Sequence, residues 1–372
     1  MKVENFSIGG VDLAIRGESV LAGKFRDLFS FVRTEGRDVD LLFDFVEGLT
    51  PWEKGSFVPV ENFLIKENCI RVIERLFTYD VYRNKKPVTV CVAENQENSF
   101  RKSKRAINKS WRYFHSHGRG LYVFSLKRFV FYIYMHILEL ELLKKGSSLV
   151  HCSGVERDGM VILFSAGEKV GKTSIMSKCL EKGWRFIADD SCVISEGGIA
   201  YIHPIPMHIY KYQERQNRAL VAGMLEHMGF FDKLNWSLWG WLKSPAHVVR
   251  WLRPEDIFGE IRIARKGKIK SVIHMQEKRN ITDFTLDKVP PEHLSHLMTN
   301  SFLDEIKNLV NSSIVLNSYR RDQFLPTVAE IYGKICDVYA KALAEGDCYQ
   351  LAIPERSPAG EVYAFLERSL WS

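Results

Sequence analysis

Short apolar runs separated by polar turns fill the first 95 residues of the chain. Alternating apolar and polar positions predict strands in the runs VDLAIRG (11–17), VDLLFDFVEG (39–48), FLIKENCIRVIE (63–74) and VTVCVAEN (88–95). Between the first two runs, residues 22–33 have the spacing of a helix. The pattern therefore predicts an N-terminal unit that is strand-rich or α/β.

The most apolar stretch of the chain is LYVFSLKRFVFYIYMHILELELL at 121–143. It contains five charged or titratable residues, Lys127, Arg128, His136, Glu139 and Glu141. That density argues against a membrane span and favours a largely buried amphipathic helix that starts near Ser125. We expect a domain over residues 1–120, this helix as a connection over 121–146, and a second domain over 147–372.

The pattern changes at Ser147 to strand, glycine-rich turn, helix and strand. Residues 147–164 predict a hairpin whose second arm, Met160–Phe164, is fully apolar. Residues 173–182 have helical spacing, and 184–188 predict a strand that leads into two aspartates. This order is typical of an α/β domain.

Composition and charge set limits on the function. The 372 residues are 46% hydrophobic and carry a net charge of +7, which excludes disordered and fibrous classes and only mildly favours anionic ligands. A basic run at 101–105, followed by Lys109 and Arg112, is read first as a solvated helix face or loop and second as a contact with an anionic partner. Because no helicase-type or RNA-binding motif accompanies it, we expect no nucleic-acid partner.

The seven cysteines include no CxxC pair, which fits neither a disulfide framework nor a zinc site. The first residues, MKVENFSIGG, lack the apolar core of a signal peptide. Both observations lead us to expect a cytoplasmic protein.

Residues 204–254 hold half of the eight tryptophans: Trp236, Trp239, Trp241 and Trp251. One interpretation is a helical insertion that packs onto the core. The other is a mobile flap or a substrate-binding surface, because aromatic side chains supply contact area for partners.

The string AGEKVGKT at 166–173 has the [A/G]xxxxGK[S/T] form of a phosphate-binding loop, or Walker A motif, with alanine at its first position. It follows an apolar strand and opens a helix, which is the context such a loop requires. The glycines let successive N–H groups point inward at the positive end of the helix dipole. Lys172 is then expected to reach the β- and γ-phosphates of ATP, and the Thr173 hydroxyl to coordinate Mg²⁺. The residues expected to bind the nucleotide are Ala166, Gly167, Glu168, Lys169, Val170, Gly171, Lys172, Thr173 and Ser174.

Asp189 and Asp190 follow sixteen residues after Thr173, at the end of the next predicted strand. In a parallel α/β sheet this edge collects ligands, so both carboxylates are expected to face the loop. One would hold the metal and the other would accept the proton of an attacking hydroxyl. Because successive strand residues point to opposite sides, a second interpretation has only one of them reach the metal.

His151, the run VILFSAGEKVGKTS, the helix SIMSKCLEKGW and the segment RFIADDSCVI occur in an order that resembles the catalytic core of HPr kinase/phosphorylase, a relative of phosphoenolpyruvate carboxykinase. The match covers residues 151–194. The resemblance implies an HPr kinase/PEP carboxykinase-like P-loop kinase core, preceded here by an additional α/β N-terminal domain that matches no family we can name. The resembled enzymes are typically hexamers, so it also implies a homo-oligomer.

Carried over by position, the resemblance makes Asp189 the base that activates the acceptor hydroxyl and Asp190 a residue near the metal, with the two roles open to exchange. His151 would lie close to the transferred phosphoryl group. The family's Glu-Ile-Arg-Gly signature is not cleanly present; residues 254–262 stand in its place and offer Glu255 or Glu260 as metal contacts. The segment CYQLAIPER at 348–356 resembles a late element of divergent members.

From these observations we expect an ATP- and magnesium-dependent kinase. Its acceptor would be a hydroxyl, that of a serine in a protein or peptide substrate. A small-molecule kinase, acting on a sugar or other metabolite, is the first alternative. A nucleotide-binding regulator without phosphotransfer is the second, and the aspartate pair counts against it because a pure binder needs no base beside the metal.

Overall fold

The computed structural model describes residues 2–36, 38–82, 85–95, 124–167, 170–319 and 325–371, and its chain divides into two compact units. Unit 1 comprises Met1–Trp111, Val123–Lys145 and Ile306–Ile331, and unit 2 comprises Arg112–Tyr122, Gly146–Glu305 and Tyr332–Ser372. The change of unit at 145/146 is close to the expected boundary. Residues 306–331, which the sequence analysis assigned to the second domain, instead pack within unit 1. The basic run at 101–112 lies outside the described residues.

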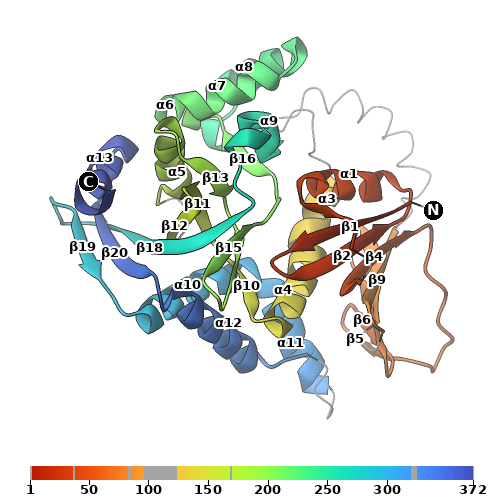
Figure 1. The fold of residues 1–372 in the computed structure, drawn as a ribbon. Coiled ribbons are helices and arrows are strands. Elements are labelled where there is room, and N and C mark those ends of the chain that lie inside the picture. Colours follow the sequence, from red (N-terminus) through yellow and green to blue (C-terminus); the bar gives the residue numbers. More distant parts are fainter. Residues whose placement is uncertain are drawn as a thin grey trace. The chain divides into compact units, whose positions relative to one another are not determined.

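Unit 1 is built on a mixed sheet with the strand order β3-β1-β2-β4-β9-β8-β7-β6-β5 (Figure 1). Its described strands are β1 (Val3–Ile8), β2 (Val11–Arg16), β3 (Arg33–Thr34), β4 (Leu41–Val46), β5 (Val58–Val60), β6 (Phe63–Ile65), β7 (Cys69–Ile73), β8 (Phe77–Tyr82) and β9 (Val88–Glu94). β4 runs parallel to β2 and β9, and the other pairs are antiparallel.

The helix of unit 1 expected at 22–33 is α1 (Val20–Leu28), followed by a 3₁₀ turn, η1 (Ser30–Val32). It begins earlier than expected because Ser19 caps it, accepting a hydrogen bond from the Ala22 amide at 3.1 Å.

The buried helix expected near Ser125 contains three segments, α3 (Phe124–Phe129), a π-helical turn η2 (Val130–Tyr134) and α4 (Met135–Lys144). The Phe129 ring centroid lies 4.7 Å from that of Phe25 and 5.4 Å from that of Phe43. The helix is therefore part of the aromatic core of unit 1, in addition to leading the chain onward. No helix in the described part of the chain is long and apolar enough to cross a membrane.

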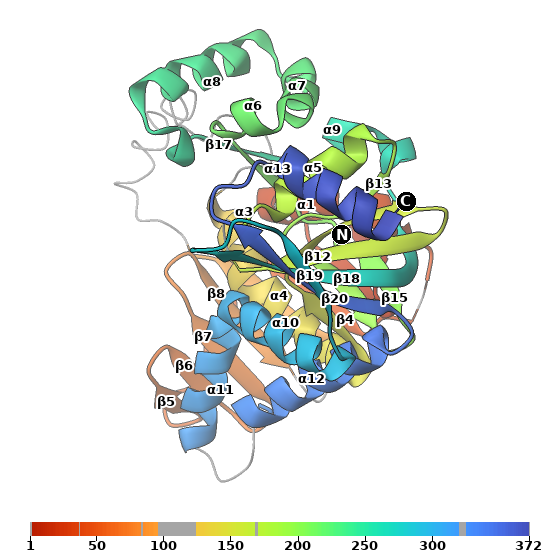
Figure 2. The same cartoon turned by 90° about the vertical axis from the view of Figure 1, so that its left-hand side faces the viewer.

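Unit 2 contains a second mixed sheet, with the order β10-β14-β15-β18-β12-β11-β13 and with β20 and β19 added beyond β18. Its strands are β10 (Ser147–Val150), β11 (Cys152–Arg157), β12 (Met160–Ala166), β13 (Arg185–Ala188), β14 (Cys192–Ser195), β15 (Ile199–Ile202), β18 (Lys266–Lys278), β19 (Thr285–Lys288) and β20 (Asp347–Pro354). α5 (Lys172–Glu181) and α13 (Ala359–Leu366) cover one face, and α10 (Pro291–Glu305) and α12 (Val328–Leu343) cover the other (Figure 2). The chain is thus an α/β protein, as its sequence predicts.

The strand directions differ from the expected parallel sheet. β12 is parallel to β18, and β18 to β20, but β11 lies between β12 and β13 and is antiparallel to both. Two strands antiparallel to the same neighbour run in the same direction. The carboxyl ends of β12 and β13 therefore still share one edge of the sheet, which brings the loop after Ala166 and the aspartates after Ala188 together.

The tryptophan-rich insertion begins and ends in a two-stranded antiparallel ribbon, β16 (Met207–Tyr210) and β17 (Val249–Leu252). Its helices are α6 (Gln213–Gln216), α7 (Arg218–His227) and α8 (Phe230–Leu242), followed by η3 (Pro245–His247). Trp236 and Trp251 are buried, whereas Trp241 is 84% exposed. The insertion therefore packs through some tryptophans and presents another to the outside.

Candidate active site

The loop that the sequence singles out lies between β12 and α5, as its motif requires. β12 ends at Ala166 and α5 begins at Lys172. Gly171 is the N-cap of α5 with φ 102°, a left-handed conformation that favours glycine and lets the chain turn into the helix. Glu168 and Lys169 lie outside the described residues. The Ser174 N–H donates to the Gly171 carbonyl at 3.0 Å, and the earlier N–H groups of the first turn open onto this turn.

Lys172 is buried at the start of α5, with only 8% of its surface exposed. Its Nζ donates to the carbonyl oxygens of Ala166 and Gly167, both at 2.9 Å, and lies 2.9 Å from His151 Nε2. Burial lowers the pKa of Lys172, and the charges of Asp190 and Asp189 act in the opposite direction. The ammonium is thus held under the loop, next to both aspartates.

His151 occupies the turn between β10 and β11, and its ring faces two charged groups. Its Nε2 contacts the Lys172 ammonium. Its Nδ1 lies 3.7 Å from Oε1 of Glu305, the last residue of α10. A protonated Nδ1 would face the carboxylate and leave Nε2 to accept from the ammonium. His151 therefore contacts Lys172, the residue predicted to bind the phosphates.

Asp189 joins the loop directly, because the Thr173 hydroxyl donates to its Oδ1 at 2.8 Å. The carboxyl group is 5% exposed, and burial, with the neighbouring charge of Asp190, raises its pKa to about 8. Asp189, which directly follows β13, is thus hydrogen-bonded to the Thr173 hydroxyl, the group that the motif predicts to coordinate Mg²⁺.

Asp190 has φ 69°, a left-handed conformation that is uncommon outside glycine. This turn breaks the alternation of strand side chains, so the second carboxylate remains at the site, where its Oδ2 lies 2.9 Å from His208 Nδ1. Burial would raise the pKa of Asp190, but the hydrogen bond and charge of His208, with His151 and Lys172, hold it at about 2. The two neighbouring carboxyl groups therefore differ: the pKa of Asp189 is raised and the pKa of Asp190 is lowered.

The insertion supplies further groups that sequence reasoning missed. His208 belongs to β16, and its ring lies 4.6 Å from that of Trp251 on β17. Asn217, fully buried, donates from Nδ2 to Ser174 Oγ at 3.3 Å, and its Oδ1 has no hydrogen-bond partner among the described residues. Burial raises the pKa of Tyr212, as do the charges of Asp189 and Asp190. No sequence signal connects these three residues to a loop that lies 34 or more positions earlier.

The remaining missed neighbour is His274 on β18, which pairs with Ser165 across the sheet and lies 3.3 Å from its hydroxyl. Burial lowers the pKa of His274 to about 4, and the charge of Lys172 adds to the effect. A signal is present in the sequence SVIHMQE at 271–277, where a single histidine interrupts an apolar run.

Among the described residues, no hydrogen bond or ion pair is seen between the loop and either Glu255 or Glu260. Glu255 lies on α9 (Pro254–Phe258), which packs against α7, and its charged neighbours are Arg253, Asp256 and Glu260. Glu260 lies on η4 (Glu260–Arg262), where Arg262 donates to the Leu180 carbonyl at the far end of α5. With a rise of about 1.5 Å per residue, that end is roughly 10 Å from Thr173. The role of these two glutamates as metal contacts stays a prediction.

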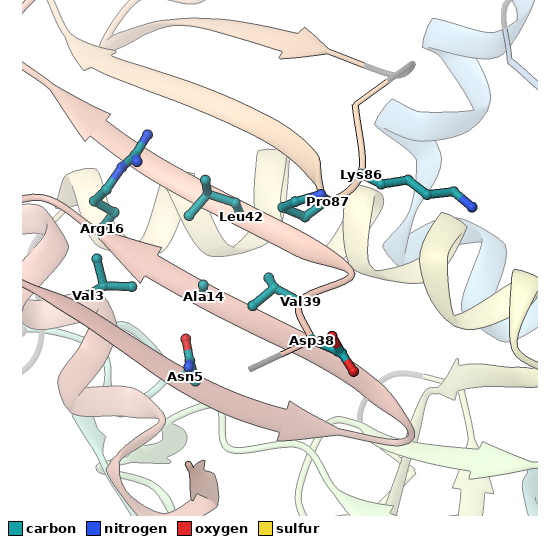
Figure 3. A pocket seen from close by; sticks show the side chains of 9 residues that line it. All are labelled: Val3, Asn5, Ala14, Arg16, Asp38, Val39, Leu42, Lys86 and Pro87. Atoms are coloured by element: carbon teal, nitrogen blue, oxygen red, sulfur yellow. The ribbon is translucent and has the colours of Figure 1, made fainter. Parts of the chain in front are cut away.

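A shallow hollow on the sheet of unit 1 has no part in this constellation. It is lined by nine residues, Val3, Asn5, Ala14, Arg16, Asp38, Val39, Leu42, Lys86 and Pro87 (Figure 3). Arg16 is already bound to Asp44, with Nε 2.8 Å from Oδ1. The chemistry that the sequence predicts is gathered in unit 2.

No family model and no curated protein matches the chain. Among solved structures, the HPr(Ser) kinase/phosphatase from Coxiella burnetii is similar over 59% of this chain and 95% of that chain, with a TM-score of 0.29 and 8% sequence identity. At these values the similarity says nothing about activity or family. The case for a function rests on the side chains around α5.

Proposed function

We propose that the chain is an ATP- and Mg²⁺-dependent kinase that transfers the γ-phosphoryl group to a hydroxyl, on a serine of a protein or peptide. The observation that supports this most is the 2.8 Å hydrogen bond between Thr173 and Asp189, one residue from the buried Lys172 at the N-terminus of α5. A hydroxyl, a carboxyl pair, an ammonium and a helix N-terminus at one sheet edge are the groups that phosphoryl transfer uses.

The phosphate chain would bind at the turn from Gly167 to Thr173. Free N–H groups of the first helical turn would donate to the phosphate oxygens, and the helix dipole favours their charge. The Lys172 Nζ donates hydrogen bonds to two loop carbonyls and contacts the His151 ring. Its ammonium is thereby fixed under the loop, where it neutralises charge on the β- and γ-phosphates.

The residues present fit Mg²⁺. Among the described residues no group of three or more histidine, cysteine or acidic side chains could hold a metal by itself, but magnesium in nucleotide sites takes one or two protein oxygens and completes its shell with phosphates and water. The Thr173 hydroxyl and the Asp190 carboxylate are hard oxygen donors of that kind. When bound, the ion would neutralise charge on the β- and γ-phosphate oxygens.

In the transfer step the acceptor hydroxyl oxygen forms a bond to the γ-phosphorus, the bond from that phosphorus to the bridging oxygen of ADP breaks, and the hydroxyl proton passes to a carboxylate. We assign that carboxylate to Asp189, because its raised pKa lies near neutral pH and makes its ionised form the stronger base of the pair, whereas His208 balances the charge of Asp190. Positioning and charge neutralisation then account for most of the catalysis.

Calorimetry of the full chain with ATP and Mg²⁺, followed by mass spectrometry of candidate serine-containing proteins, peptides and small hydroxyl metabolites incubated with both, tests the proposal. Binding together with a gain of one phosphate on a serine supports it. Phosphate appearing only on a small metabolite identifies the first alternative, and binding without any phosphorylated product identifies the nucleotide-binding regulator. Absence of ATP binding would overturn all three.

A further inference from the structure

Six large apolar side chains of α8 face outward. Phe230, Phe231, Leu234, Leu238, Trp241 and Leu242 are between 39% and 84% exposed, and we call this set the apolar face of α8. At about 100° per residue, their positions fall within an arc of about 120° on the helix. A surface helix of a globular protein normally packs such an apolar stripe against the core.

The inner side of α8 is held by polar contacts. The Asn235 side-chain oxygen accepts from Arg250 Nη2 at 2.7 Å, and Trp236 Nε1 donates to Glu214 Oε1 at 2.6 Å. Both Asn235 and Trp236 are buried. These hydrogen bonds fix the rotation of the helix about its axis, so the apolar face is directed away from the rest of unit 2. In both views α8 lies at the outer margin of unit 2, beyond α7 (Figures 1 and 2).

The exposed charged side chains of α8 and its C-cap are both lysines. Lys233 and Lys243 are exposed, and the Lys243 ammonium lies 4.4 Å from the centroid of the Trp239 ring. The single acid of α8, Asp232, is half-buried and interacts electrostatically with Arg250 on β17. The outward side of the helix therefore combines large apolar groups with cations and presents no acid.

We propose that α8 is an interfacial helix that binds unit 2 to an anionic phospholipid surface. Phenylalanine, leucine and tryptophan on one side, with lysines at the boundary, are the composition of helices that lie in the headgroup region. The lysines complement anionic headgroups. A second copy of α8 suits this face less well, because antiparallel pairing would bring the lysines of both copies together with no acid between them.

Co-sedimentation of the full chain with vesicles tests the proposal. We expect the protein to sediment with vesicles of equal parts phosphatidylglycerol and phosphatidylcholine, and at least tenfold less with phosphatidylcholine alone. The variant Phe231→Ser/Leu238→Ser/Trp241→Ser should lower the partition coefficient at least tenfold, and so should Lys233→Glu/Lys243→Glu. Ile261→Ser, which removes an apolar side chain that is 88% exposed on η4, is the matched control and should bind as the wild type does.

Quenching of tryptophan fluorescence by brominated lipid gives a second measurement on the wild-type protein, independent of whether the triple variant folds. Quenching that disappears in Trp241→Ser places this side chain in the bilayer interface. The proposal is overturned if the wild type neither sediments with anionic vesicles nor is quenched. It is equally overturned if Trp241→Ser abolishes self-association in sedimentation velocity while vesicle binding is absent throughout.

Discussion

His208 Nδ1 lies 2.9 Å from Asp190 Oδ2, and so joins the tryptophan-rich insertion to the acidic pair of the candidate active site. Trp251 is paired with His208 in the two-stranded ribbon. The centroid of its ring lies 4.6 Å from that of the imidazole, so the indole limits the movement of the histidine. The insertion is therefore part of the site as well as a separate surface.

Replacing His208 by glutamine should lower kcat of phosphoryl transfer at least tenfold and leave the dissociation constant of ATP within about threefold. The reason is that Asp190 loses the partner that orients and balances its charge. Steady-state kinetics at several Mg²⁺ concentrations provide the measurement. His247→Gln, at an exposed histidine of the same insertion, is the control, and an equal loss in both variants would contradict the positioning role.

Replacing Lys172 by alanine should abolish nucleotide-dependent activity and weaken ATP binding at least tenfold, because hydrogen bonds to charged groups are each worth about 1.5–3 kcal/mol. Calorimetry with ATP and Mg²⁺ measures the change. Lys178→Ala, which removes an ammonium paired with Glu181 later on the same helix, should bind ATP normally. Unchanged binding and turnover in Lys172→Ala would remove the phosphate-loop assignment.

Replacing Asp189 by asparagine should keep ATP affinity within a few fold and reduce transfer by about 10²- to 10⁴-fold, the usual contribution of a general base. Single-turnover assays with the identified acceptor separate the two effects. Asp190→Asn is the comparison: if it loses transfer while Asp189→Asn loses Mg²⁺ dependence, the two roles are exchanged. Full transfer by Asp189→Asn would rule out Asp189 as the base.

Acid should destabilise unit 1 through His136. Burial lowers the pKa of this α4 histidine to about 4, and its Nε2 has no hydrogen-bond partner among the described residues. The ordinary histidine value of 6.5 applies to the unfolded chain, so the folded state binds fewer protons. Its contribution is complete above about pH 6.5 and is lost by about 1.4 kcal/mol per pH unit as the pH falls toward 4.

Urea unfolding followed by circular dichroism at pH 7.5 and 5.0 measures this loss. His136→Leu should reduce the difference between the two free energies of unfolding, whereas the exposed His227→Gln should leave it unchanged. An undiminished difference in His136→Leu would assign the acid sensitivity to other groups.

Local features of the site could be predicted from the sequence. The apolar strand before Ala166, the helix after Gly171 and the strand before Asp189 are each encoded by residues within the segment itself, so their order and approximate bounds follow from periodicity. The contact of Thr173 with Asp189 follows once the two strand ends share an edge. Their separation by the antiparallel β11 did not follow, because strand order depends on long-range pairing that a local pattern does not contain.

Groups that reach the site from distant segments were missed for the same reason. His208, Tyr212 and Asn217 occur in a stretch whose composition indicated contact area, and only the ribbon β16–β17 shows that its first strand passes the acidic pair. The segment 306–331 is another case: its helix α11 (Lys307–Tyr319) contacts β5 of unit 1, more than 240 positions earlier in the chain. Glu255 and Glu260 were proposed from their place in a family resemblance, and their role stays a prediction.

The left-handed backbone at Asp190 has an evolutionary consequence. Asparagine, aspartate and glycine adopt a φ of 69° readily, whereas alanine and branched residues are strained there. Among substitutions that remove the carboxylate, asparagine and glycine keep this turn at the least cost. We therefore expect a descendant of this protein that had dispensed with the carboxylate and kept the backbone turn to carry one of those two residues at position 190.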